Sequence, residues 1–236
     1  EFVEALRILA KKTGVQLRES GFDKGLSSKK EKIYTLNKLA MDFYHFVLTK
    51  HKSGKAALSY LEEKRKIDAR LTETFMIGFS PKDGTSLSNY LINKKKFRKE
   101  DLIEAGLVVN AGYRVLDFFR GRIMFPLLDH RGNVVGFSGR EIEGILTDGF
   151  SGKYINTRDT IVYHKGEMFF ALNTAKEEIK KLDKIIIVEG EFDVVTAAAF
   201  VPLQNGRRLK VHLCLTREQT SIFSAKRPAI GQAKIQ

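Results

Sequence analysis

The chain has 236 residues and is 43% hydrophobic, which is enough to build one large domain or two modest ones around a buried core. Lysine and arginine total 41 against 28 acidic residues, and this net charge of +13 favours a polyanionic partner such as nucleic acid, although a solvated lysine-rich surface gives the same count. The single cysteine, Cys214, excludes an internal disulfide and a CxxC zinc site, and no apolar run approaches the roughly 18 residues of a membrane span.

The first 32 residues are expected to form a helix followed by a linker. Apolar residues recur at helical spacing from Phe2 to Ala10, whereas 21–32 is rich in glycine, serine and lysine and has no periodicity. We interpret 1–32 as a docking helix and linker after an upstream domain, since the chain begins with Glu1 and not with methionine. With one cysteine and no apolar leader, the protein is expected in the cytoplasm, away from membranes.

Helical patterning resumes at residue 33. Apolar spacing predicts helices from Ile33 to Val47, from Ala56 to Lys66 and, further along, from Glu167 to Lys181. The last of these is amphipathic, with lysines on its polar side.

A hairpin is predicted in the middle of the chain, because Ile123–Leu128 and Val134–Phe137 are strand-like and flank a cluster of turn residues. Three arginines are expected to flank one edge of that sheet, where planar guanidinium groups suit phosphate. They are Arg120, Arg122 and Arg140. Ion pairs with Glu141 or Glu143 are the structural alternative.

The run 184–188 predicts a short strand buried on both faces, which Gly190 ends before a helix over Phe192–Phe200. Glu189 then lies at the carboxyl end of the strand and Asp193 in the first helical turn. Two carboxylates at this place suit a magnesium ion that also touches phosphates. Acidic residues at a helix start are also stabilised by the helix dipole without any function.

Several motifs resemble those of DnaG-type bacterial primases. Residues 187–194 (IVEGEFDV) are similar to the first acidic motif of the TOPRIM domain, and 104–108 (EAGLV) to the primase "EAGL" turn. The block from Phe119 to Arg140 resembles "FRxRIMFPIxDxxGxVIGFGGR" nearly residue for residue. Residues 153–157 and 161–166 resemble the segment "KYLNSPET...FxKG".

The resemblance implies a basic surface beside a metal site. It places Arg140, Lys153, Asn156 and Lys165 where the template strand and incoming nucleotide are held. Tyr154 is a candidate for stacking on a base, or else belongs to the core. Glu189 would bind Mg²⁺ or Mn²⁺, supported by Asp193.

The fold implied is α/β: an α+β subdomain with helices and a mixed sheet over 33–181, then the beginning of a doubly wound TOPRIM domain over 182–236. TOPRIM domains complete the metal site with a later Asp-x-Asp pair, but no aspartate follows Asp193. Truncation, an aberrant ending and lost catalysis all account for this.

The resemblance implies nucleotidyl transfer that makes short RNA primers on single-stranded DNA from ribonucleoside triphosphates. The protein would be a monomer that meets a replicative helicase through a domain outside this chain, and zinc would belong to another such domain. The alternatives are a catalytically incomplete module that binds single-stranded DNA, or another TOPRIM protein such as a phage primase-helicase.

Overall fold

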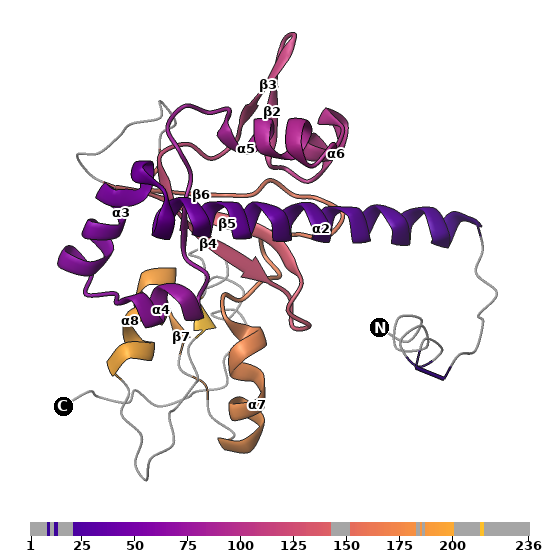
Figure 1. Cartoon of the computed structure of the whole chain (residues 1–236). Coiled ribbons are helices and arrows are strands. Elements are labelled where there is room, and N and C mark those ends of the chain that lie inside the picture. The colour runs from indigo at the N-terminus through magenta and orange to yellow at the C-terminus, as the bar shows by residue number, and fades with distance from the viewer. Residues whose placement is uncertain are drawn as a thin grey trace. The chain divides into compact units, whose positions relative to one another are not determined.

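The computed structural model describes residues 9, 12–13, 21–142, 152–182, 185, 187–200 and 213–214 (Figure 1). The chain divides into two units, Glu1–Lys32 and Ile33–Gln236, and every contact discussed below lies within the second. Among the described residues, no helix combines the length and the apolar character that crossing a membrane requires.

Helices make up much of the described structure. In chain order they are α2 (Gly21–Lys50), the 3-10 turn η1 (Lys52–Gly54), α3 (Lys55–Ser59), the π-helix η2 (Tyr60–Lys64), α4 (Ala69–Thr74), α5 (Ser86–Asn89), the π-helix η3 (Tyr90–Lys94), α6 (Lys99–Glu104), α7 (Leu172–Leu182) and α8 (Glu191–Phe200).

Two helices differ from their predicted bounds. Helix α2 already begins at Gly21, so the segment expected to be a linker is helical. Lysine, leucine and glutamate are good helix formers, and extending the amphipathic helix that follows costs less than nucleating a new one. Helix α7 begins at Leu172 and not at residue 167, because Ala171 has a left-handed φ of 63° that the right-handed helix cannot include.

The central sheet has four strands in the order β1-β4-β5-β6, and all three pairings are antiparallel. Its strands are β1 (Gly78–Phe79), β4 (Arg122–Leu128), β5 (Val134–Glu141) and β6 (Tyr154–Asn156). The predicted hairpin is confirmed as β4 and β5. Asp129 closes its turn, since one carboxylate oxygen accepts the backbone N–H groups of Arg131 and Asn133 at 2.8 and 2.9 Å.

The sheet is buried on both faces. Alternate side chains of a strand point to opposite faces. Ile123 and Phe125 therefore join one apolar cluster, while Met124 joins another that includes Leu91 of η3. A sheet covered in this way holds its strand positions firmly, and polar side chains placed on it have fixed directions.

Two further strand pairs complete the described structure. β2 (Val108–Ala111) and β3 (Arg114–Asp117) form an antiparallel hairpin. β7 (Ile187–Val188) pairs in parallel with β8 (Leu213–Cys214), as expected for the start of a doubly wound sheet. Ile187 is 40% exposed, so the burial predicted for this strand on both faces is not seen within the described residues.

A structural repeat with an offset of 30 residues lies in the helical part. The first repeat (57–79) ends at β1, and the second repeat (87–109) runs into β2. Six backbone hydrogen bonds recur in both copies, for example from Ile67 N to Leu61 O at 3.0 Å and from Phe97 N to Leu91 O at 3.1 Å. Both the π-helices and the six-residue helices that follow them have bounds that differ by 30.

The left-handed backbone positions repeat as well. Lys66 and Lys96 have φ of 56° and 61°, and Met76 and Gly106 have φ of 49° and 70°. Identical residues occupy only four of the 23 paired positions. They are Tyr60 and Tyr90, Leu61 and Leu91, Lys64 and Lys94, and Lys66 and Lys96. In Figure 1, the second repeat and the β2–β3 hairpin lie at the top, while α4 of the first repeat lies near α8.

Candidate nucleic-acid and metal site

The sheet register separates the arginines that the sequence placed at one edge. Arg122 pairs with Glu141, whereas Arg140 pairs with Ile123, so the two arginines are one position out of phase and point to opposite faces. Arg122 is 1% exposed and donates from Nη1 to the carbonyl oxygens of Gly139 and Gly152 at 3.3 and 3.0 Å. These bonds join backbone segments inside the protein, so Arg122 is not part of the site described next.

Arg140 lies on the sheet face that α8 covers. Its Nη1 donates to the hydroxyl of Tyr154, its cross-strand partner on β6. The guanidinium also lies over two aromatic rings, 5.0 Å from the centroid of Tyr154 and 4.6 Å from that of Phe192. Arginine over an aromatic face is a favourable electrostatic contact, which grows as water is excluded. We call Arg140, Tyr154 and Phe192 the Arg140 cluster.

The acidic turn, residues 189–193, adjoins this cluster. Glu189 and Asp193 are exposed, and the backbone carbonyl of Gly190 accepts from Asp193 and Val194 at 3.0 and 3.1 Å to begin α8. A Cβ on Gly190 would lie 3.2 Å from Asp193 Oδ2 and 3.8 Å from the Tyr154 hydroxyl. The predicted carboxylates therefore flank a glycine that Tyr154 approaches closely.

Glu191 is a buried acid that sequence reasoning did not select. Burial raises the pKa of its carboxyl group, and the nearby charge of Asp193 raises it further. The Ser138 hydroxyl and the Arg140 guanidinium oppose that rise. The one signal in the sequence is its place beside the two predicted carboxylates, which does not reveal that its side chain turns inward.

Arg140 Nε and Asn156 Oδ1 are two of the buried polar atoms on this sheet face that have no hydrogen-bond partner among the described residues. Asn156 pairs with Ser138 on β5, two positions from Arg140, so both atoms belong to one patch of the sheet. Buried polar groups are nearly always paired with protein or ordered water, and unpaired ones mark a place for water or a ligand.

The remaining predicted residues differ in how deeply they are buried and in which elements they contact. Lys153 is exposed next to Tyr154, and its carbonyl accepts from Glu141 N at 3.0 Å. Lys165 is exposed in a turn that its amide makes with Asp159 Oδ1 at 3.2 Å. Arg120 is partly buried, with its aliphatic carbons packed on Gly84. Of these three, the structure places only Lys153 directly beside the Arg140 cluster.

The first repeat also contributes to the site. Arg65 lies 4.7 Å from the centroid of Phe192 and donates from Nε to the Tyr60 hydroxyl at 2.8 Å. One ring of α8 is therefore flanked by arginines from two parts of the fold. A lone arginine in a helical stretch gives no sequence signal for this contact.

The donor set fits a hard cation only in part. Glu189 and Asp193 are exposed carboxylates, the ligand type that Mg²⁺ and Mn²⁺ take. Within the residues that the structure describes, no three side chains of histidine, cysteine, aspartate or glutamate gather as a ligand group.

Comparison with known proteins identifies the family. Residues 43–176 match the model of the DNA primase catalytic core, N-terminal domain. This chain belongs to that family. The match covers the first repeat, the second repeat and the sheet that carries the Arg140 cluster.

Known primases resemble this chain both in sequence and in structure. A DNA primase of Synechococcus elongatus is 37% identical over 174 residues, which cover 73% of this chain and 24% of that protein. The RNA polymerase domain of Mycobacterium tuberculosis primase DnaG, in complex with a double-stranded DNA oligomer with a 6-nucleotide overhang, has a TM-score of 0.70 at 28% identity. That match covers 81% of this chain and 58% of the other.

A DnaG primase catalytic domain bound to single-stranded DNA has a TM-score of 0.65 at 29% identity and covers 80% of this chain and 54% of that one. The mixture of helices and antiparallel sheet seen here is that of the primase catalytic core. The chain spans about a quarter to a third of the length of the curated primases it matches.

Proposed function

We propose that this chain is part of the catalytic core of a DNA primase, which joins ribonucleotides into a short RNA primer on a single-stranded DNA template. The observation that supports this most is the patch formed by Arg140, Tyr154 and Asn156 next to the exposed acidic turn. Unpaired buried donors and acceptors beside two exposed carboxylates suit a ligand that carries both phosphates and a metal ion. The DNA-bound relatives support nucleic acid as the partner.

In this proposal, the basic residues of the site bind phosphates, and the carboxylates hold the metal ion that assists the reaction. The primer 3′ oxygen forms a bond to the α-phosphorus of the nucleotide, and pyrophosphate leaves. Glu189 and Asp193 would hold Mg²⁺ or Mn²⁺, which when bound activates the attacking oxygen and neutralises developing charge. Lys153 would grip phosphates as a flexible point charge, as would Lys165 at the edge of the same subdomain.

Arg140 would act differently from the lysines. Its guanidinium is oriented by the Tyr154 hydroxyl and by two aromatic faces, so little side-chain entropy is lost when it meets a phosphate. Burial raises the pKa of Tyr154, which keeps the phenol neutral beside the acidic turn. A neutral hydroxyl can orient the arginine without adding a second negative charge next to the carboxylates.

The second candidate is a module that binds single-stranded DNA without catalysis. The third acid of the acidic turn, Glu191, is buried, and within the described residues no three acidic or histidine side chains gather as a ligand group, which favours this candidate. An incomplete carboxylate set should hold a divalent ion weakly, while the basic residues would still bind DNA.

A primer-synthesis assay with magnesium, single-stranded template and labelled ribonucleotides separates the two. The chain should make primers, and Glu189→Gln should reduce synthesis by more than the roughly 100-fold that loss of a supporting partner costs at metal sites. DNA affinity should change little, because the substitution removes only one exposed carboxylate and leaves every basic residue in place. The matched control is Glu62→Gln, at an exposed glutamate on η2. DNA binding without any synthesis would replace the polymerase by the binding module.

A further inference from the structure

The second repeat carries an exposed turn with a net positive charge, whereas acidic residues balance the charge of the equivalent turn in the first repeat. Over residues 62–68 the formal charges of the first repeat cancel, while over residues 92–98 those of the second repeat sum to +4. The backbone of the two turns is the same, including the left-handed residue at Lys66 and Lys96. The difference in charge is therefore a property of the side chains and is not imposed by the fold.

Most of this charge is not neutralised by neighbouring acids in the part of the chain that the structure describes. Arg98 pairs with Asp101 at 3.1 Å, and Lys99 stands 4.0 Å from Glu100. Lys94, Lys95 and Lys96 are exposed, and no carboxylate among the described residues pairs with them. Three neighbouring cations repel one another, so a polyanion bound across them would remove an unfavourable interaction.

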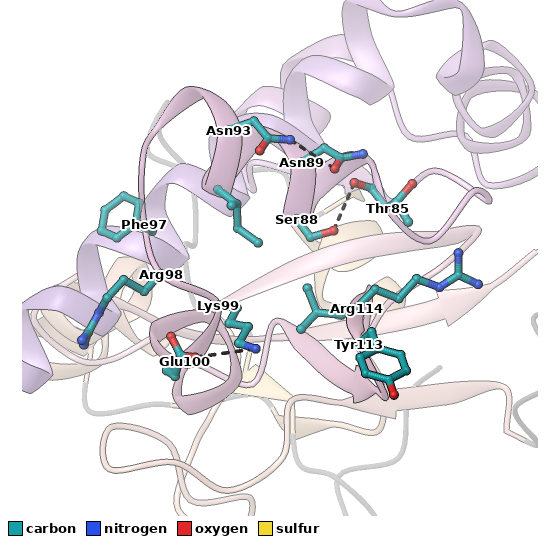
Figure 2. A pocket seen from close by; sticks show the side chains of 12 residues that line it. Thr85, Ser88, Asn89, Asn93, Phe97, Arg98, Lys99, Glu100, Tyr113 and Arg114 are labelled. Carbon is teal, nitrogen blue, oxygen red and sulfur yellow. Dashed lines mark hydrogen bonds and ion pairs between the residues drawn. The ribbon is translucent and has the colours of Figure 1, made fainter.

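The turn adjoins a pocket of about 500 Å³ between η3, α6 and the β2–β3 hairpin (Figure 2). Figure 2 shows the side chains of Asn89 and Asn93 on one side of it and Tyr113 and Arg114 on the hairpin opposite. The lining also includes Lys99, the acid Glu100 and the partly buried Phe97. The pocket thus combines amide groups, cations, one carboxylate and two aromatic rings.

Tyr113 is the most exposed large hydrophobic side chain of those described, at 108% of its reference area. It occupies the second position of a two-residue hairpin turn, after Gly112, whose φ is 71°. Such turns require glycine at the first position but make no demand for an aromatic ring at the second. Full exposure of a tyrosine gives no folding energy, and aromatic rings among cations are the usual surface on which unpaired bases stack.

We propose that Lys94, Lys95, Lys96, Lys99, Tyr113 and Arg114 form a second binding site for a single strand of nucleic acid, which we call the basic turn site. Phosphates contact the lysines of the turn and Arg114, while one base stacks on Tyr113 at the mouth of the pocket. In a duplex the bases are already stacked on each other, so no base is free to stack on an exposed tyrosine ring. The proposal rests on the proposed function in one respect, namely that nucleic acid is the partner. It concerns a different surface, which is made by the second repeat and the β2–β3 hairpin. No residue of this surface belongs to the Arg140 cluster or to the acidic turn.

The test compares two double variants with the same change of charge at the same two backbone positions. Lys94→Gln with Lys96→Gln alters the basic turn site, and Lys64→Gln with Lys66→Gln alters the equivalent turn of the first repeat. Binding of labelled single-stranded DNA is measured from low to moderate salt, together with single-stranded RNA and a blunt DNA duplex. All four lysines are exposed, so thermal unfolding of both variants should match that of the parent chain.

The Lys94 and Lys96 variant should lower the slope of log affinity against log salt by roughly 1.4 for single strands, about 0.7 for each phosphate that the variant no longer neutralises. The Lys64 and Lys66 variant should leave the slope unchanged. An equal decrease in both variants would show a general effect of net charge and overturn the site. An unchanged slope in both would overturn it as well.

Tyr113→Ala tests the stacking contact without changing the charge. It should weaken single-strand binding by roughly five-fold to a hundred-fold, and Tyr113→Phe should retain it, because the ring face is kept. An equal weakening on the blunt duplex would overturn the assignment to a single strand. The DNA and RNA arms then decide which strand of the reaction the site prefers.

Failure of this proposal is distinguishable from failure of the proposed function. If Lys153→Ala weakens single-strand binding and primers are made, but the Lys94 and Lys96 variant binds normally, only the basic turn site is refuted. If the parent chain makes no primers and yet the double variant loses affinity, the basic turn site stands and the polymerase is refuted.

Discussion

The first and second repeats trace the same backbone path with largely different side chains. Leu61 and Leu91 are both fully buried, as are Ile77 and Leu107 at the ends of the repeats. The turns between them diverge: Arg65 of the first repeat contacts Phe192 of α8, whereas Lys95 at the same position has only the ring of Tyr90, 5.6 Å away, among the described residues. The buried apolar positions keep the backbone path the same in both repeats, whereas the exposed turn makes a different contact in each repeat.

This comparison also separates two kinds of basic residue. Arg65 and Arg140 are partly or wholly buried against aromatic rings and position the start of α8. The lysines of the second repeat are solvated and act at long range, with a strength that salt reduces. A net charge of +13 therefore includes arginines that are fixed against aromatic rings and lysines that are exposed to solvent.

The largest effect is expected where the repeats agree. Leu61→Ala and Leu91→Ala each remove a fully buried side chain, and each should lower the free energy of unfolding by about 2–5 kcal/mol, since a cavity remains in the core. Chemical denaturation of the two variants measures this. A decrease in only one of them would mean that the repeats share a path without sharing a packing role.

A smaller effect is expected at the left-handed position where the repeats differ. Gly106 has φ of 70°, and a Cβ there would lie 2.9 Å from Thr157 Cγ2, so Gly106→Ala should cost roughly 1–3 kcal/mol from strain and overlap. Met76 holds the equivalent position in the first repeat at φ of 49°. Met76→Gly relieves strain but removes packing, and it should change the free energy of unfolding by less than about 1 kcal/mol in either direction. Equal and large decreases at both positions would contradict this account.

The smallest effect concerns how each repeat begins. Asp117 of β3 accepts the N–H groups of Leu87 and Ser88 at 2.9 Å each, at the start of α5, whereas α3 begins after Gly54 with no side-chain cap. Burial raises the pKa of Asp117 above its ordinary value of 3.8, although the hydrogen bonds from Ser88 and Leu87 oppose this.

The folded protein therefore binds a proton at Asp117 more tightly than the unfolded chain does. As pH rises from about 3.8 through the folded pKa, Asp117 should make unfolding progressively easier, and above that range its contribution stays constant. Asp117→Asn should lose this component of the pH dependence in thermal unfolding, and Asp42→Asn, at an exposed aspartate of α2, should keep it. An unchanged pH profile in Asp117→Asn would remove Asp117 as its source.

Much of the fold was predictable from sequence because its elements carry local signals. The β4–β5 hairpin, the glycine that ends the strand and the helix predicted over Phe192–Phe200, which begins one residue earlier, follow from period, turn residues and an apolar run. The repeat was hidden, because its copies agree in their hydrogen bonds but share only four residue identities. Backbone paths of this kind are fixed by burial, which many apolar residues satisfy equally well.

For the candidate site, the sequence indicated residue types but not the directions in which the side chains point. Arg122 and Arg140 look equivalent in sequence, and only the register of β4 against β5 shows that one faces α8 and the other does not. Glu191 lies between two predicted carboxylates, yet it turns into the protein. The alternation of side chains gives the sheet face of each residue within one strand. Which residues of two strands share a face depends on the pairing register, which the connecting turn sets.

Phe192 has a consequence for how the acidic turn moves. Its ring lies 4.7 Å from the guanidinium of Arg65 and 4.6 Å from that of Arg140, so α8 cannot rotate about its axis without leaving one of them. The Phe192 ring therefore links the start of α8, which carries the carboxylates, to η2's end at Arg65 and to β5 at Arg140. A change at Arg65, which is more than 120 residues from α8 in sequence, is therefore expected to alter how firmly the start of α8 is held.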